Sequence, residues 1–311
     1  MAKVCAIVVA YNSALHIGDC LEALCGQSGW EILVVDNAST DNTLPLARRF
    51  ADKVQIVAEH QNLGFAGAVN QALRITSSDV VVILNPDAVP SPGTLDCLAA
   101  AVANPEIGAA GGLLLDEHRK VQHGFVMRRF PTLIYMICET LLLNRLWPRN
   151  PWNRRYRCLD ADYDRVQVVD QPAGAALAFR SEVWRAVGGF DQQFYPVWFE
   201  DVDFCRRISD RGWKLLYEPN AIFSHAGAHS VDKLSYSDRQ LFWYSNLLRY
   251  FQKHHGRLET LMLRAAIFVG ATIRAAAIVA GVGPRTATRT EALRAFALVL
   301  HTVITRVRSA D

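Results

Sequence analysis

The first hundred residues alternate between short apolar runs and longer segments in which apolar residues recur every three or four positions. The short runs have the length of buried strands and lie at Val4–Val9, Glu31–Val35, Val54–Val57 and Val80–Leu84. The segments with helical spacing lie at Leu15–Cys25, Asp41–Phe50, Gly64–Ile75 and Thr94–Val102. This alternation predicts an α/β fold in which helices cover both faces of a parallel sheet.

Polar residues follow each of the four predicted strands. Tyr11 follows the first strand, Asp36 the second, Asn62 the third, and Asn85 and Asp87 the fourth. The carboxyl ends of parallel strands meet at one edge of a sheet, and open α/β sheets bind ligands there. Asp and Asn are also common in turns and helix caps, so each residue taken alone fits a structural role equally well.

The turn after the first strand does not have the sequence of a known phosphate-binding loop. It reads YNSALHIGDC, without the G-x-G-x-x-G of dinucleotide-binding folds or the G-x-x-x-x-G-K-[ST] of P-loops. A nucleotide bound at this edge therefore needs another source of positive charge. A divalent cation, Mg²⁺ or Mn²⁺, held by the carboxylate of Asp87 is the expected source.

Two later segments have a composition of their own. Residues 148–164 are polar and irregular, which predicts a loop across the active face. The small residues Pro172 to Ala176 allow either the close approach of a sugar or tight internal packing.

Composition indicates a globular protein from a reducing compartment. The 311 residues are 51% hydrophobic, enough for one large domain or two small ones. The seven cysteines are scattered without a C-x-x-C pair, which argues against a disulfide framework or a zinc site. The N-terminal residues read as a first strand rather than as a signal peptide.

Five motifs in order resemble the inverting family-2 glycosyltransferases, and most of all their bacterial rhamnosyltransferase-like members, which extend lipid-linked cell-wall or surface glycans. The resemblance covers roughly residues 4–230 and rests on VVAYN, VVDNASTDNT, NLGFAGAVNQAL, LNPDA and GGFDQQFYPVWFEDVDFCRR. It implies the α/β GT-A fold of nucleotide-diphospho-sugar transferases, with a Rossmann-like mixed sheet and a C-terminal helical extension. We expect a GT-A domain over residues 1–256 and a basic, apolar helical tail over residues 257–311.

The resemblance assigns a donor site at the predicted sheet edge. Tyr11 and Asp36 match the residues that stack on and hydrogen-bond the base and ribose of the nucleotide. Asn62, Gly64 and Asn70 match the segment that lines the donor site.

It also assigns the metal site. Asp87 matches the last acid of the family's D-x-D metal motif, whose first position is Asn85 here and so carries no charge. His225 matches a histidine that completes the metal site in some relatives, although a lone histidine after an apolar stretch is often structural. His229 lies four residues on, but Gly227 between them argues against a helical metal-binding pair.

The catalytic base is expected in the stretch FYPVWFEDVDFCRR. Its acids fall in the first turn of a predicted helix, where the helix dipole favours the charged form. By resemblance Asp201 is the general base, while Glu200 and Asp203 orient partners or bind acceptor hydroxyls. Trp198 either stacks on an acceptor sugar or belongs to the core. A helix stabilised by acidic residues in its first turn would show the same local pattern.

The C-terminal tail predicts contact with an anionic surface. Residues 257–311 hold eight Arg and three acidic residues, a net charge of +5, so the remainder of the chain carries −2. Apolar segments at residues 132–147, 261–282 and 295–305 are too often interrupted to span a bilayer, but suit helices that lie at its surface with their Arg toward headgroups. Coverage of the core, an oligomer contact or a shallow transmembrane hairpin are the alternatives. The Arg side chains would also attract an acceptor diphosphate.

These features predict a metal-assisted, inverting glycosyltransferase with a single carboxylate base. The expected reaction moves L-rhamnose from dTDP-L-rhamnose to a polyprenyl-diphosphate-linked glycan at the cytoplasmic face of the cell membrane. A nucleotidyltransferase would carry a Gly-rich basic loop after the first strand, which is lacking here. A non-catalytic sugar-binding protein would not need Asp36, Asp87 and Asp201 together. The mildly acidic body argues against nucleic-acid binding.

Overall fold

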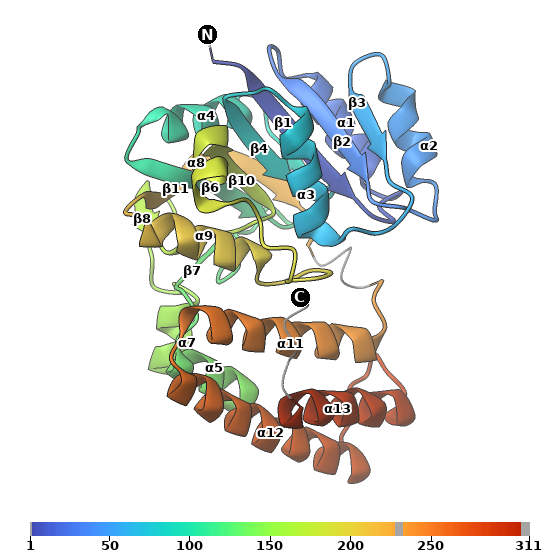
Figure 1. The fold of residues 1–311 in the computed structure, drawn as a ribbon, viewed down its shortest axis with the longest axis vertical. Coiled ribbons are helices and arrows are strands. Elements are labelled where there is room, and N and C mark those ends of the chain that lie inside the picture. The colour runs from blue at the N-terminus through green and yellow to red at the C-terminus, as the bar shows by residue number, and fades with distance from the viewer. Residues whose placement is uncertain (1, 228–232, 306–311) are drawn as a thin grey trace. The chain divides into compact units, whose positions relative to one another are not determined.

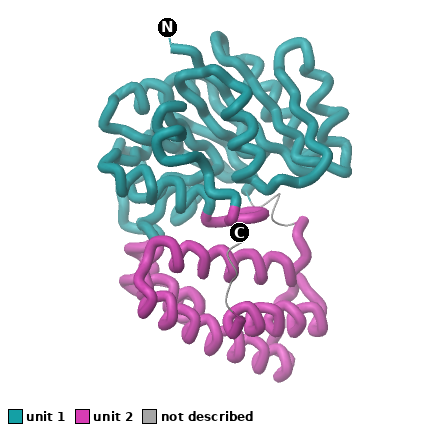
Figure 2. The backbone as a smooth tube through the Cα atoms, in the orientation of Figure 1, with its two compact units in different colours: residues 1–130, 157–192, 200–230 teal, residues 131–156, 193–199, 231–311 magenta. Residues whose placement is uncertain are grey.

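The chain forms two compact units in the computed structural model, which describes residues 2–227 and 233–305 (Figures 1 and 2). Unit 1 contains residues 1–130, 157–192 and 200–230, and unit 2 contains residues 131–156, 193–199 and 231–311. The chain passes between the units several times, so the helical unit includes far more than the expected tail after residue 256.

Unit 1 is built on a mixed sheet of nine strands. Eight of them run in the order β3-β2-β1-β4-β10-β6-β11-β5, and β8 pairs with β11. Strands β1 to β4 are parallel to one another, whereas β10 runs antiparallel between β4 and β6. The strands are β1 Val4–Ala10, β2 Glu31–Asp36, β3 Gln55–Ala58, β4 Val80–Leu84, β5 Ala88–Pro90, β6 Ile107–Leu115, β8 Gln167–Val169, β10 Ala176–Arg180 and β11 Lys214–His225, with β7 Met127–Arg128 and β9 Gln171–Pro172 forming a small second sheet.

Helices cover both faces of this sheet, as the alternating pattern predicts. Those of unit 1 are α1 Ile17–Cys25, α2 Thr43–Ala47, α3 Gly64–Ile75, α4 Thr94–Ala103, α8 Ser181–Val187 and α9 Glu200–Asp210, with a 3₁₀ turn at Arg48–Phe50. Alternate residues of β1 enter two separate cores: Ala6 and Val8 join the core that contains α1 and α4, whereas Cys5 and Ile7 join the core that contains α3, α8 and α9. The side-chain period of two therefore requires a covering layer on each face.

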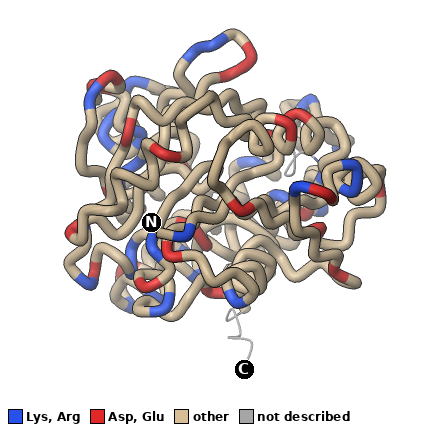
Figure 3. Tube along the Cα trace, turned by 90° about the horizontal axis from the view of Figure 1, so that it is seen from above, with Lys and Arg blue, Asp and Glu red and all other residues tan. Residues whose placement is uncertain are grey.

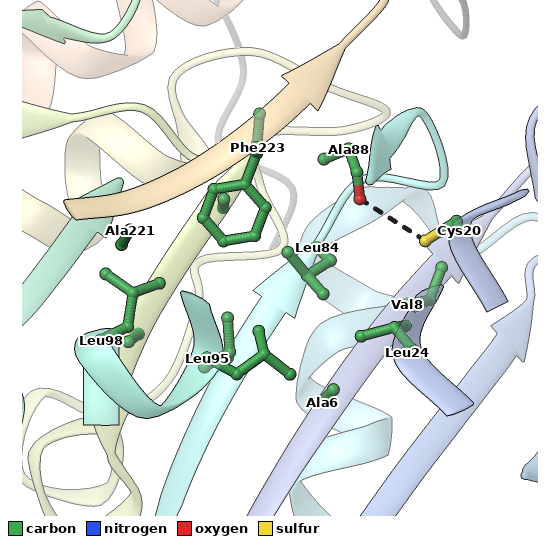
Figure 4. Close-up of a cluster of buried hydrophobic side chains, with 14 of the residues drawn as sticks. Ala6, Val8, Cys20, Leu24, Leu84, Ala88, Leu95, Leu98, Ala221 and Phe223 are labelled. Carbon is green, nitrogen blue, oxygen red and sulfur yellow. Dashed lines mark hydrogen bonds between the residues drawn. The ribbon is translucent and has the colours of Figure 1, made fainter. Parts of the chain in front are cut away.

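The α1–α4 core lies directly beneath the strand ends that carry the predicted site. Figure 4 shows Leu84 of β4 and Phe223 of β11 packed with Leu95 of α4. Nearby, Cys20 of α1 donates from Sγ to the carbonyl oxygen of Ala88 at 3.6 Å. This fully buried packing fixes the backbone on either side of Asp87.

Unit 2 is a set of helices in which two of the three arginines of the longest helix point inward. The helices are α5 Leu133–Thr140, α6 Leu143–Leu146, α7 Pro151–Tyr156, α11 Tyr236–His254, α12 Arg257–Val279 and α13 Arg289–Ile304. Arg264 of α12 donates to the carbonyl oxygens of Val303 and Thr305 at the end of α13. Arg274 donates to the carbonyl of Thr140 at the end of α5. The expectation that these arginines face lipid headgroups is therefore wrong: they satisfy the unpaired carbonyls and negative ends of two neighbouring helices.

The segment at residues 193–199 belongs to unit 2 and is held by α11. The buried amide of Asn246 donates to the carbonyl oxygens of Val197 at 2.8 Å and Tyr195 at 3.4 Å. The ring of Phe199 lies 6.1 Å from that of Trp243 and 5.9 Å from that of Tyr250. Helix α11 thus shapes the stretch of chain that leads into α9.

The predicted loop at residues 148–164 is partly helical, because Pro151–Tyr156 forms α7. Asn150 starts this turn, with its Oδ1 accepting from the backbone N–H of Asn153 at 2.8 Å. An Asn followed by Pro is a helix-start signal that outweighs the polar composition of the segment.

Acidic and basic residues are interspersed along the trace in Figure 3. Local pairs such as Lys214 with Glu106, at 2.7 Å, and Arg180 with Glu182, at 2.7 Å, bring opposite charges together in unit 1. The charges that bear on chemistry are instead those buried at the ends of the strands.

Candidate active site

The ends of β1, β2 and β4 place the predicted donor-side residues on one edge of the sheet. Ala10 is in register with Asp36, and Val8 with Leu84, so Tyr11, Asp36 and Asn85 emerge side by side. The pairing of parallel strands alone produces this arrangement.

Asp36 presents a buried acceptor at this edge. Its side chain is 2% exposed, and Oδ2 accepts from the backbone N–H of Ser39 at 3.3 Å. Its Oδ1 has no hydrogen-bond partner among the described residues. A buried oxygen without a partner is costly, so this atom is suited to accept a hydrogen bond from a bound ligand.

Asn37, which follows Asp36 directly, connects two strand ends. Its Nδ2 donates to Asn62 Oδ1 at 3.0 Å, and its Oδ1 accepts from the N–H of Leu63 at 2.8 Å. Asn62 Oδ1 in turn accepts from the N–H of Gly64 at 2.8 Å, where α3 begins with φ of 71°. The residues predicted to line the donor site are therefore held together, and Gly64 permits a left-handed backbone that strains other residues.

The side chain of Asn70 has a structural role within unit 1. Its Nδ2 donates to the carbonyl of Phe190 at 2.7 Å, and its Oδ1 accepts from the N–H of Phe190 at 2.8 Å and from Trp184 Nε1 at 3.0 Å. The side chain is 4% exposed. These bonds fix the chain after α8, and a direct contact of Asn70 with a donor stays a prediction.

Asp87 and His225 lie together because β11 pairs with β5. His225 is in register with Ala88, which places its Nε2 3.5 Å from Asp87 Oδ1. Asp87 Oδ2 accepts from the N–H of Gly227 at 3.1 Å. Both side chains are buried. His229 lies outside the described residues.

Gln122 sets the tautomer of His225. The Nε2 of Gln122 donates to the His225 carbonyl at 2.8 Å, so its Oε1 is the atom that lies 2.8 Å from His225 Nδ1. An amide oxygen only accepts, so Nδ1 carries the proton and Nε2 presents a lone pair toward Asp87. Burial lowers the pKa of His225, against the opposing charge of Asp87, which favours this neutral form.

Two acceptors that face each other in a buried place suit a cation between them. His225 Nε2 has no hydrogen-bond partner among the described residues. Imidazole nitrogen and carboxylate oxygen are both ligands of divalent metals, and a hydrogen-bonded second nitrogen is the usual support of such a ligand. In the described parts of the chain no group of three or more His, Cys, Asp or Glu side chains is arranged to hold a metal ion, so phosphate oxygens and water would complete the coordination.

The three predicted acids occupy the first turn of α9 but have different environments. Burial, with the neighbouring charge of Asp201, raises the pKa of Glu200 well above its ordinary value, which favours the neutral acid. Asp203 is fully buried and paired with Arg207 at 2.7 Å. This pairing favours an orienting role for Asp203 over contact with an acceptor.

Asp201 is the half-buried acid of the three. Its Oδ1 accepts from the N–H of Val202 at 2.8 Å. Burial raises its pKa, while the backbone bond and the positive charge of Arg128 lower it. A carboxylate that is partly accessible and has a somewhat raised pKa fits a general base. Arg128 is not part of any motif, so its role could not be predicted from the sequence.

Gly174 explains the run of small residues at 172–176. A Cβ added to it would lie 2.6 Å from Asp201 Oδ2 and 2.8 Å from Asp201 Cβ. The group that approaches Gly174 closely is therefore the predicted base itself. Of the two explanations, approach of a sugar or tight internal packing, the second holds at this position.

Comparison with known proteins identifies relatives that cover most of the chain. Residues 5–180 match the family model described as glycosyl transferase family 2. An N-acetylglucosaminyl-diphospho-decaprenol L-rhamnosyltransferase of Mycobacterium tuberculosis is 28% identical over 300 residues, covering 86% of this chain and 93% of the relative. The rhamnosyltransferase WbbL of Escherichia coli is 25% identical over 245 residues, covering 76% and 88%.

Solved structures share the fold. The mannosyltransferase PcManGT of Pyrobaculum calidifontis, in complex with GDP-Man and Mn²⁺, superposes with a TM-score of 0.58 at 22% identity, covering 97% of this chain and 86% of that one. GalNAc-T7 with UDP, GalNAc and Mn²⁺ gives a TM-score of 0.61 at 12% identity, covering 98% and 57%. At these identities the likeness concerns the fold alone.

Proposed function

The chain belongs to glycosyltransferase family 2 and is thus a glycosyltransferase, and from this premise we propose that it moves L-rhamnose from dTDP-L-rhamnose to a lipid-linked glycan, with inversion. The choice of sugar rests on the two rhamnosyltransferase relatives. The choice of acceptor rests on the printed name of the mycobacterial relative, which specifies a diphospho-decaprenol carrier.

The observation that carries the nucleotide-sugar part is the pair of partnerless acceptors at the strand ends. In this proposal Asp36 Oδ1 accepts from the nucleoside, and Asp87 with His225 Nε2 would hold a divalent cation; neither Asp36 Oδ1 nor His225 Nε2 has a hydrogen-bond partner among the described residues. When bound, such a cation neutralises the diphosphate that leaves. A site with both features is suited to a nucleotide diphosphate rather than to a free sugar.

Asp201 supplies the acid–base chemistry in this proposal. Its carboxylate accepts the proton of the attacking hydroxyl, while the N–H of Val202 and the charge of Arg128 lower its pKa against the effect of burial. Burial raises the pKa of Glu200 beside it and favours its protonated form, which leaves the role to Asp201. A single base is sufficient for inversion because attack and departure occur on opposite sides of the anomeric carbon.

Helix α12 supports attachment to a membrane surface. It is the one described helix that is long and apolar enough to cross a bilayer by length and composition. One face of it packs on α5, α11 and α13. The opposite face is uncharged along its whole length, and its larger side chains are Leu258, Leu261, Met262, Phe268, Val269, Ile273 and Val279, each 43–70% exposed.

We propose that this face lies in the headgroup region of the cytoplasmic leaflet of the membrane. With Arg264 and Arg274 turned inward, the exposed face has the composition that buries in lipid, and exposed Arg257 and Arg285 flank it where headgroups lie. A helix attached at the membrane surface can stay packed on α5, α11 and α13, whereas a helix that spans the bilayer would have to leave them. A surface enzyme would also meet an acceptor that cannot leave the membrane.

The proposal is tested by thermal unfolding of the full chain with a panel of nucleotide sugars, with and without Mn²⁺, followed by transfer assays on a short-chain diphosphate-linked N-acetylglucosamine. The correct donor raises the midpoint of unfolding because it binds only the folded form. Asp201→Asn should retain that protection and lose transfer about 100-fold or more. Equal protection by every nucleotide sugar, or normal turnover of Asp201→Asn, would contradict the proposal.

A further inference from the structure

Unit 2 contains a cavity of about 370 Å³, and of the predicted site residues Trp198 lines it. Five of its lining residues are spaced three and four apart on α11 and so share one helix face. They are Tyr236, Arg239, Gln240, Trp243 and Tyr244, and the remaining walls come from Glu139 of α5, Arg274 of α12, Trp198 and Thr286. The volume lies near the lower end of the range for small-molecule sites, about 300–1,000 Å³, which suits one sugar unit with its phosphate groups.

Aromatic rings provide the flat walls of this cavity. Trp198 and Trp243 are both half-buried, so each keeps part of its surface accessible to a ligand. Trp198 has φ of 77°, a left-handed conformation that non-glycine residues rarely adopt. The bond from Asn246 to the Val197 carbonyl holds the chain in this conformation, and strained residues held in this way cluster at functional sites.

Hydrogen-bond donors and positive charge provide the other walls. Arg239 and Arg274 outnumber the single acid Glu139, which leaves a net charge of +1 at the cavity. The Arg274 guanidinium is fixed by the carbonyls of Thr140 and Gly270. Burial raises the pKa of both Tyr236 and Tyr244, so their hydroxyls remain donors. Guanidinium groups with neighbouring hydroxyl donors suit phosphate oxygens.

One wall of the cavity, Trp198, is joined to the predicted base by a short stretch of chain. Trp198 precedes Asp201 by three residues, and consecutive Cα atoms are about 3.8 Å apart, so the two Cα atoms are at most about 11 Å from each other. We infer that the cavity binds the phosphate-bearing sugar of the acceptor, with the ring against Trp198 and Trp243 and the phosphates at Arg239 and Arg274. This inference rests on the proposed function, because it assigns a place to the acceptor of that reaction.

The test measures binding to the full chain by titration calorimetry. The probes are N-acetylglucosamine joined through a diphosphate to a farnesyl chain, free N-acetylglucosamine, and inorganic pyrophosphate. Arg239→Gln removes a phosphate partner, and Thr286→Trp fills the cavity from an exposed position. Both changes should weaken the diphosphate-linked probe at least tenfold and leave nucleotide diphosphate binding unchanged. Arg294→Gln, an exposed arginine of α13 outside the cavity, is the matched control and should change neither.

The probes separate the two halves of the ligand. Free N-acetylglucosamine should bind more weakly and be insensitive to Arg239→Gln, while pyrophosphate should lose affinity in Arg239→Gln. Wild-type affinity for the diphosphate-linked probe in both Arg239→Gln and Thr286→Trp would overturn the inference even if transfer is normal. If both variants lost that affinity but the protein transferred no sugar from any donor, the cavity would still be a binding site for the diphosphate-linked sugar, and the proposed reaction would be overturned.

Discussion

Gly174 lies so close to Asp201 that a methyl group in place of its hydrogen would be 2.6 Å from a carboxylate oxygen. Gly174→Ala should therefore displace the Asp201 side chain. A displacement of about 1 Å at a reacting group costs on the order of 100-fold in rate, so we expect kcat to fall by about that factor while donor affinity is retained.

Gly18→Ala is the matched control, because nothing lies within 4 Å of its added methyl group. It should leave kcat unchanged. Steady-state kinetics and donor titration on the two variants measure the effect, and an unchanged kcat in Gly174→Ala would show that Asp201 is not the base.

Arg128 should set the acid limb of the pH–rate profile. Its positive charge lowers the pKa of Asp201, so Arg128→Gln raises that pKa further above the ordinary value of 3.8. Transfer needs ionised Asp201, so the variant should lose kcat/KM at low pH and approach the wild type as pH rises. Profiles of kcat/KM against pH for Arg128→Gln, with Arg129→Gln as control, measure this. A uniform loss at every pH would instead indicate a role in substrate binding.

Glu200 should make the protein less stable as pH rises. The folded state retains the Glu200 proton above pH 4.5 whereas the unfolded chain releases it, because burial raises the folded pKa. The unfolding free energy of the wild type therefore falls with increasing pH above about 4.5, by up to about 1.4 kcal/mol per unit until the folded pKa is reached. Glu200→Gln removes this fall.

Thermal unfolding at pH 5 and pH 8 tests the Glu200 prediction. The gain of Glu200→Gln over the wild type should be larger at pH 8. Glu22→Gln, at an exposed position of α1, should show no such difference. A gain that is the same at both pH values would mean that Glu200 is ionised in the folded protein.

Asp87 should matter for nucleotide binding only when a divalent cation is present. Asp87→Ala removes one of the two acceptors that face each other at 3.5 Å, so it should weaken nucleotide diphosphate binding at least tenfold in Mn²⁺. In EDTA the variant and the wild type should bind equally. Calorimetric titrations of both proteins with Mn²⁺ and with EDTA measure these affinities. If the variant and the wild type bound equally under both conditions, Asp87 would not be a metal ligand.

The uncharged face of α12 should anchor the protein to lipid. Phe268→Lys with Ile273→Lys places two charges on side chains that are 43% and 47% exposed. Co-sedimentation with vesicles of anionic phospholipid should fall at least tenfold, because apolar burial is replaced by a charge. Val168→Lys, on an exposed residue of β8, is the control. If the double variant sedimented with vesicles as well as the wild type, this face of α12 would not bind lipid, and a contact between protein chains would be its alternative role.

The strands and helices of the first hundred residues follow from their sequence because each is a local pattern. Gly64–Ile75 and Val80–Leu84 have the bounds that their periodicity predicts. The polar residues after β1, β2 and β4 come together because parallel register is set by neighbouring apolar strands. These are contacts that a period of two or of 3.6 residues determines.

The remaining parts of the site depend on pairing between distant segments. The antiparallel insertion of β10 between β4 and β6, and the pairing of β11 with β5 that brings His225 to Asp87, join residues about 70 to 140 positions apart. No local pattern encodes such register. For the same reason the hydrogen bonds of Gln122 to His225 could not be predicted from the sequence. The bonds of Arg264 and Arg274 to helix ends could not be predicted either, since their partners are backbone carbonyl groups that every residue carries.

The hold of Asn246 on the carbonyls of Tyr195 and Val197 has a consequence for how the chain can be shortened. The matched family region ends at residue 180, yet the stretch that delivers Asp201 is clamped by a side chain near residue 250. A truncated protein that keeps every motif but stops before α11 would lose this clamp. We therefore expect the segment that leads into Asp201 and helix α11 to be exchangeable between relatives only as one piece.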